Sequence, residues 1–135
     1  MKIAVCVDDN RGMLFNKRRQ SRDKVVLADL MTLSERIRIH PFSEKLFTEY
    51  TGCIDVNENF LEDAQEDDLC FVENQLLKPQ EELISQLIVY KWNRKYPADF
   101  RLDLDLSQWN LKEQIEFVGN SHEKITREIY DRGEN

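Results

Sequence analysis

Six basic residues gather near the start of a chain that is acidic as a whole. The 135 residues include 26 acidic and 19 basic side chains, which gives a formal net charge of −7. Guanidinium groups bind phosphates and carboxylates through paired hydrogen bonds, so a local cluster of them predicts an anion site. The alternative interpretation is a solvated charged loop that leads into a helix. The cluster consists of Arg11, Lys17, Arg18, Arg19, Arg22 and Lys24.

Acidic and amide side chains stand beside this cluster and complete the candidate ligand site. Asp8 and Asp9 follow an apolar run, where paired carboxylates either hold Mg²⁺ with a phosphate or simply form a turn. We predict no metal site, because a third oxygen ligand is not evident in the sequence. The predicted ligand-binding residues are Asp9, Asn10, Arg18, Arg19, Arg22 and Asp23.

Two histidines are present, and His122 is the better candidate for chemistry. It lies in a short polar segment, and an imidazole there can move protons near neutral pH. The alternative is a surface residue without a catalytic role. His40 precedes Pro41, and its distance from His122 in the sequence is not that of a metal motif. We therefore take His122 and Asp23 as candidate catalytic residues, and no cofactor follows from the sequence.

The three cysteines and the charge limit the classes of protein to consider. Cys6, Cys53 and Cys70 form an odd set without Cys-x-x-Cys spacing, which favours free thiols and a cytoplasmic protein. Membrane association is not expected, since no stretch approaches the roughly 18 apolar residues of a membrane span. The acidic balance argues against general nucleic-acid binding.

The elements that must position these residues follow from the hydrophobic pattern. Short apolar runs at 3–7, 69–72 and 87–92 predict buried strands. After Ser21, a plausible N-cap, apolar residues recur at helical spacing as far as Ile37. Shorter helices are expected at 43–50, 57–64 and 79–86.

The C-terminal third is predicted to be rich in strands. Alternating residues at 100–106 predict a half-buried strand that forms a long hairpin with 87–92, and 115–118 predicts a further strand. Residues 121–132 fit either a helix or a strand. We expect one domain over 1–135, of the α/β class, with a mixed central sheet flanked by helices.

The order of these segments resembles the dihydrofolate reductase fold. The elements at 69–72, 79–86, 87–92 and 100–106, with Asp99 in a turn and Trp109 in a loop, are similar to its last half. The beginning is also similar, with a first strand, an Asn10-x-Gly12 turn, a polar loop and a helix. The resemblance implies that Asp23 stands where an early-helix acid binds the pteridine in that family.

Two motifs of that family are absent from the sequence. Its Leu-Pro-Trp stretch is replaced by Phe-Asn-Lys-Arg-Arg at 15–19. Its glycine pair, which lets the cofactor pyrophosphate approach the backbone, is replaced by Glu-Asn-Gln at 73–75. A carboxylate there repels phosphate. The resemblance therefore implies the fold, in a degenerate form, and does not support hydride transfer.

The sequence predicts a small protein that binds a small anionic or nucleotide-like ligand beside the first strand and the basic loop. One alternative is a non-catalytic interaction domain, whose basic loop meets an acidic surface such as the block at 58–68. Another is local RNA binding through 11–24. Whether the protein is an enzyme, and its oligomeric state, are open at this point.

Overall fold

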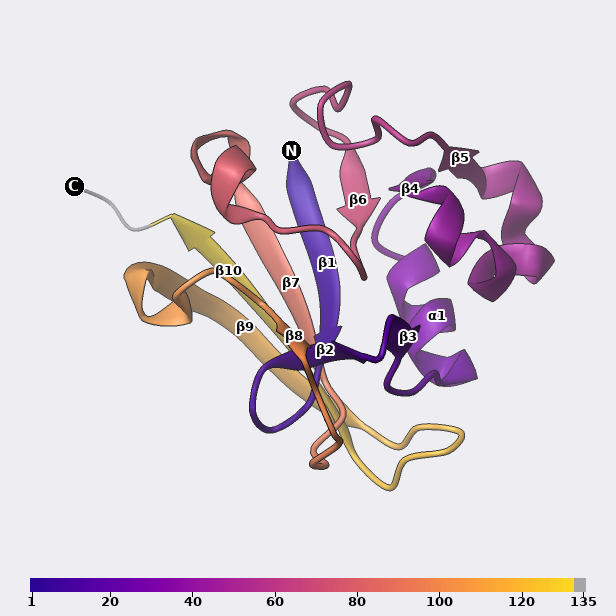
Figure 1. Cartoon of the computed structure of the whole chain (residues 1–135), viewed down its shortest axis with the longest axis vertical. Helices are drawn as coiled ribbons and strands as arrows, with labels where there is room; N and C mark the ends of the chain where they lie inside the picture. Colours follow the sequence, from indigo (N-terminus) through magenta and orange to yellow (C-terminus); the bar gives the residue numbers. More distant parts are fainter. Residues whose placement is uncertain (133–135) are drawn as a thin grey trace.

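A mixed sheet of seven strands forms the centre of the molecule (Figure 1). The structure is a computed structural model that describes residues 1–132. The strand order is β5-β4-β6-β1-β7-β10-β9. The first five strands are parallel, and β10 is antiparallel to both of its neighbours, β7 and β9. The mixed sheet and the strand-rich C-terminal region are thus confirmed. The strands are β1 (Lys2–Val7), β4 (Ile37–Ile39), β5 (Ile54–Val56), β6 (Leu69–Phe71), β7 (Gln86–Lys91), β9 (Trp109–Phe117) and β10 (Ile125–Arg132).

A second, smaller sheet crosses the end of β1 (Figure 1). Its order is β3-β2-β8, with β2 at Gly12–Phe15, β3 at Arg18–Arg19 and β8 at Phe100–Arg101. The helix α1 spans Lys24–Met31. Three further segments are 3₁₀ helices: η1 (Pro41–Cys53), η2 (Lys78–Leu83) and η3 (Leu106–Gln108).

The central strands of the sheet are buried on both faces. Successive side chains of a strand point to opposite sides, so each of these strands contributes to two hydrophobic clusters. On one face, Ala4 packs with Val26 and Leu30 of α1. On the other, Ile3 and Val5 pack in the cluster formed with loop residues. This two-sided burial explains why the central strands are continuous apolar runs in the sequence.

The first helix begins later than a cap at Ser21 would place it and ends earlier than its apolar stripe suggests. Asp23, and not Ser21, is the N-cap, since its side chain accepts a hydrogen bond from the Val25 N–H. The helix ends at Met31. Ile37, expected on the same stripe, is fully buried in β4. A strand residue thus continued the helical spacing by coincidence.

Three of the expected helices take other forms. The segments at 43–50 and 79–86 lie in or overlap 3₁₀ helices, and η2 stops at Leu83 before β7 begins. Residues 57–64 form turns, although the expected inward residues Phe60 and Leu61 are buried. The open question at 121–132 resolves to a strand, β10, preceded by a polar loop.

The expected hairpin between 87–92 and 100–106 is wrong. β8 covers only Phe100–Arg101 and pairs with β2, while β7 lies between β1 and β10. The apolar and acidic residues that alternate beyond β8 do so for a different reason. Leu102 and Leu104 are buried, whereas the Asp103 carboxylate between them accepts hydrogen bonds from the N–H groups of residues 77 and 78. The strand expected at 115–118 is part of the longer β9.

The residues that follow the parallel strands lie at one end of the sheet, the end formed by the carboxyl ends of these strands. Asp8 follows β1, Glu73 lies just beyond β6, and Trp92 follows β7. Ligand crevices of open α/β sheets lie at these carboxyl ends. The loop between β9 and β10 reaches the same end of the molecule (Figure 1). Among residues 1–132, no helix combines the length and the apolar character needed to cross a membrane.

Asp8 fixes the turn after β1. Its carboxylate accepts hydrogen bonds from the N–H groups of Asn10, Gly12 and Tyr96 and from the Gln20 amide, at 2.6 to 3.1 Å. These bonds hold the pKa of Asp8 below its ordinary value despite the opposing effect of desolvation. The Asp8 carboxylate thus has a structural role in the turn.

The close packing around this turn makes Gly12→Ala a destabilising change. An added Cβ would lie 2.5 Å from the Gln20 amide nitrogen, 2.6 Å from the Ala98 Cβ and 3.0 Å from an Asp8 oxygen. We expect a loss of about 1–3 kcal/mol in the free energy of unfolding, the usual cost of overpacking. Denaturant unfolding of the wild type and of Gly12→Ala measures this loss. Gly52→Ala is the control, because no atom lies within 4 Å of its added Cβ; equal stability of the two variants would contradict the prediction.

Candidate functional site

The carboxylate of Asp23 is the centre of a hydrogen-bond network at the sheet edge. It caps α1 and also accepts the N–H groups of Asn120 and Ser121, each at 2.8 Å. The imidazole Nδ1 of His122 lies 2.9 Å from Asp23 Oδ2. Desolvation by itself would raise the pKa of Asp23, but these donors hold this pKa far below its ordinary value. Asp23 is therefore an ionised, fully enclosed carboxylate that joins α1 to the β9–β10 loop.

The ring of His122 is held on three sides. Its side chain is 1% exposed, and its plane stacks on Trp92 with ring centroids 4.6 Å apart. Nδ1 faces the ionised Asp23, so this nitrogen carries a proton. The remaining nitrogen, Nε2, is then free to accept a hydrogen bond when the ring is neutral.

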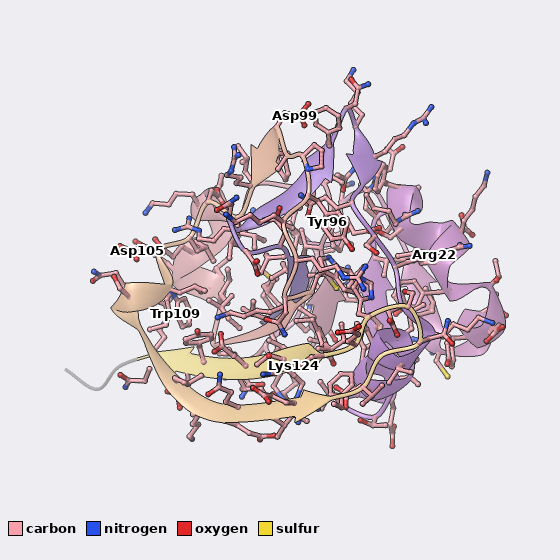
Figure 2. The ribbon with its side chains drawn as sticks, turned by 90° about the horizontal axis from the view of Figure 1, so that it is seen from below. Arg22, Tyr96, Asp99, Asp105, Trp109 and Lys124 are labelled. Carbon is pink, nitrogen blue, oxygen red and sulfur yellow. The ribbon has the colours of Figure 1, made fainter. Side chains whose placement is uncertain are left out.

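Two hydroxyl groups meet at this nitrogen. Ser21 Oγ lies 3.1 Å from Nε2, and the Tyr96 hydroxyl lies 3.0 Å from it. Ser21 comes from the basic loop before α1, whereas Tyr96 comes from the loop between β7 and β8. Figure 2 labels Tyr96, from the loop between β7 and β8, and Arg22, from the segment that leads into α1. The network thus brings together three separate segments of the chain: 21–25, 92–96 and 120–122.

An ion pair between Arg19 and Glu73 lies next to this network. The Arg19 guanidinium donates to both oxygens of Glu73, at 2.8 and 2.9 Å. Ser43 Oγ donates to the same carboxylate at 2.7 Å. The hydrogen bonds to Glu73 raise the pKa of Arg19 above its ordinary value. The charge of Arg19 is therefore already neutralised within the protein.

Two cavities of different size lie at this edge. Between α1 and the ends of the central strands, only about 20 Å³ is left, the space of a single water. Cys6 lines it, and burial raises the pKa of this thiol well above its ordinary value, so the thiol stays neutral. A hollow of about 630 Å³ opens on the far side of Asp23, between α1, η1 and the β9–β10 loop.

The larger hollow has the size of a small-molecule site and a basic lining. Arg22 and Lys24 reach it from the start of α1, and Lys45 reaches it from η1. Apolar surface and acceptor groups alternate with the cations. The other lining residues are Ser21, Asp23, Leu27, Leu46, Thr48, Glu49, Tyr50, Asn120 and Ser121.

The structure distributes the sequence-predicted residues over different places. Arg22 and Asp23 line the large hollow. Arg18 lines a third hollow of about 340 Å³, on the side of the small sheet, which Arg19 also borders. Asp9 and Asn10 are exposed and line none of these three hollows. His122 lies behind Asp23 and Ser21, enclosed by the protein.

Several residues of the site were not found from the sequence. Ser21 reads as a helix cap, yet it faces His122, which is 101 positions away. Trp92 stacks on His122 and Tyr96 bonds to it, yet these two residues lie 30 and 26 positions away in the sequence. Lys45 stands alone in its segment and joins Arg22 only through the packing of η1 beside α1. No local pattern in the sequence marks these contacts.

Comparison with known proteins shows the fold. No family model matches the chain, and a search of curated proteins gives no match. Among solved structures, the chain is similar to a dihydrofolate reductase from Enterococcus faecalis, determined in complex with NADP(H) and a further compound. The TM-score is 0.69 at 12% identity, over 99% of this chain and 97% of that one. The protein has a dihydrofolate reductase-like fold, as its sequence predicted.

The segment after β6 does not fit the pyrophosphate of a dinucleotide cofactor. Glu73 and Asn74 follow the strand, where the sequence has no glycine. The Glu73 carboxylate is 9% exposed as a residue and is locked by Arg19 and Ser43. The next helical segment, η2, begins at Lys78 without a side-chain cap. We therefore derive no reaction step through such a cofactor.

The Asp23 network predicts a pH-dependent contribution to stability. Asp23→Asn places an amide where three backbone N–H groups need an acceptor, so we expect a loss of about 3 kcal/mol at pH 7. Because the folded-state pKa is lowered, the wild-type advantage is complete above about pH 4–5 and shrinks as pH falls further. Denaturant unfolding of both proteins from pH 7 to pH 2 measures this narrowing. Asp9→Asn, at an exposed position, is the control; a constant difference across this range would refute it.

Proposed function

We propose that the protein binds a small anionic, nucleotide-like ligand in the large hollow beside Asp23. The observation that carries the proposal is the set of three cations, Arg22, Lys24 and Lys45, around a hollow of about 630 Å³. None of these three side chains forms an ion pair within residues 1–132. Their charges therefore remain available to a phosphate or carboxylate.

The rest of the lining suits an anion that also carries an uncharged part. Tyr50 and Leu46 provide apolar surface, and the Glu49 carboxylate is an acceptor for ligand hydroxyl groups. Asp23 adds little repulsion, because five donors already surround its oxygens. This combination favours a phosphate ester with a ring or sugar over free inorganic phosphate.

The contacts of the basic stretch do not favour the alternatives of an acidic protein partner or RNA. Arg11 donates to the Leu102 carbonyl, and Arg19 is bound to Glu73. Arg18 and Arg22 line separate hollows. Arg11 and Arg19 are thus held by groups of the protein, which reduces the basic surface that both alternatives need.

Thermal unfolding with adenosine monophosphate and with pyrophosphate tests the proposal. We expect the midpoint to rise with ligand concentration and to saturate, since a ligand at 100 times its dissociation constant adds about 2.7 kcal/mol. Each of the variants Arg22→Ala and Lys45→Ala should weaken binding about tenfold, the loss of one charge-assisted hydrogen bond. Lys95→Ala removes an equal charge from an exposed loop and should bind as the wild type does. No shift with either compound, or an equal loss in Lys95→Ala, would refute the proposal.

A further inference from the structure

We propose that Ser21 is a nucleophile activated by His122, and that the site hydrolyses carboxylic esters that carry an anionic group. The ester chemistry rests on the arrangement of Ser21, His122 and Asp23. The anionic part of the substrate rests on the proposed function, because the cations of the large hollow would bind it. Neither the fold nor the comparison assigns a reaction of this kind to the chain.

The three side chains form a continuous relay. Ser21 Oγ lies 3.1 Å from His122 Nε2, and His122 Nδ1 lies 2.9 Å from Asp23 Oδ2. Activation of a serine requires a base within hydrogen-bond reach and a third group that orients the base. Such relays recur on unrelated folds and are recognised by geometry, not by the order of residues in the chain. Here Asp23 is the positioning residue and His122 is the general base.

The surroundings of His122 hold its imidazole ring in one orientation. The ionised Asp23 retains the proton on Nδ1, so the neutral imidazole presents the lone pair of Nε2 to Ser21. Stacking on Trp92 prevents the ring from turning away. The Tyr96 hydroxyl meets the same nitrogen, so it competes with Ser21 in the resting protein and is a donor for an oxyanion formed beside Ser21.

A substrate can reach the serine but not the histidine. Ser21 is half-buried and lines both the small cavity and the large hollow. The His122 side chain is enclosed, which excludes water from its hydrogen bond with Asp23. An anion held by Arg22 and Lys45 would present its ester group from within the hollow that Ser21 borders.

The reaction proceeds in two balanced steps. Ser21 Oγ attacks the acyl carbon and its proton passes to His122 Nε2; the ester C–O bond then breaks, and the proton leaves with the alcohol. Water next attacks the acyl-serine carbon and gives a proton to Nε2. That proton returns to Ser21 Oγ as the acyl–serine bond breaks. The products are a carboxylic acid and an alcohol.

Labelling with an alkyl fluorophosphonate tests the nucleophile. Ser21 Oγ should displace fluoride from phosphorus, and peptide mass spectrometry should place the adduct on residue 21. We expect Ser21→Ala to abolish this adduct and His122→Gln to slow its formation by at least about 100-fold, the usual contribution of a general base. Ser107→Ala is the matched control, since the Ser107 hydroxyl bonds a carboxylate, Asp105, with no imidazole between them; it should label at the wild-type rate.

Two outcomes would overturn the proposal, and both are measured on the wild-type protein. One is the absence of an adduct on residue 21 of the native wild type. The other is an equal rate of labelling in native and urea-unfolded protein, which would show that the fold does not activate the serine. The fluorophosphonate carries no anion for the basic hollow, so its result is independent of the nucleotide titration. Labelling without nucleotide binding would leave Ser21 as the nucleophile and refute only the proposed ligand.

Discussion

The enclosed carboxylate of Asp23 is the interaction on which the rest of this sheet edge depends. It accepts donors from the first turn of α1 and from three consecutive residues of the β9–β10 loop, so two segments far apart in sequence share one charge. Gly119 shows how closely they pack, because a Cβ there would lie 2.5 Å from an Asp23 oxygen. The loop can approach only because this position has no side chain. Removal of the charge would leave several buried N–H groups without an acceptor.

A second charge, Glu73, determines what kind of site this edge can be. By pairing with Arg19 and accepting from Ser43, it fills the space between the basic loop, β6 and η1. The space next to it shrinks to about 20 Å³, and the open hollow lies instead beyond Asp23. The fold is dihydrofolate reductase-like, and the Arg19–Glu73 pair leaves little free space between the basic loop, β6 and η1.

Much of the fold can be predicted from the sequence where burial is two-sided. The apolar runs at 3–7, 69–72 and 87–92 could hardly be solvated, and each forms a central strand. Prediction fails where another interaction produces the same pattern. Leu102 and Leu104 are buried as a strand would bury them, but Asp103 binds the backbone before η2 and no ladder forms. β9 has exposed residues from 110 to 116, so only its pairing with β10 defines its length.

Only part of the candidate site could be predicted from the sequence. Asp23 and His122 stand out by type, yet the 2.9 Å contact between them depends on the register of β10 against β7 and on the loop before it. The Asp23 carboxylate stabilises the fold through three backbone donors, and it also acts on the neighbouring imidazole. Its physical effect here is on His122: the proton is fixed on one nitrogen, and the other is aimed at two hydroxyl groups. This orientation is the geometric basis of the proposal that Ser21 is a nucleophile.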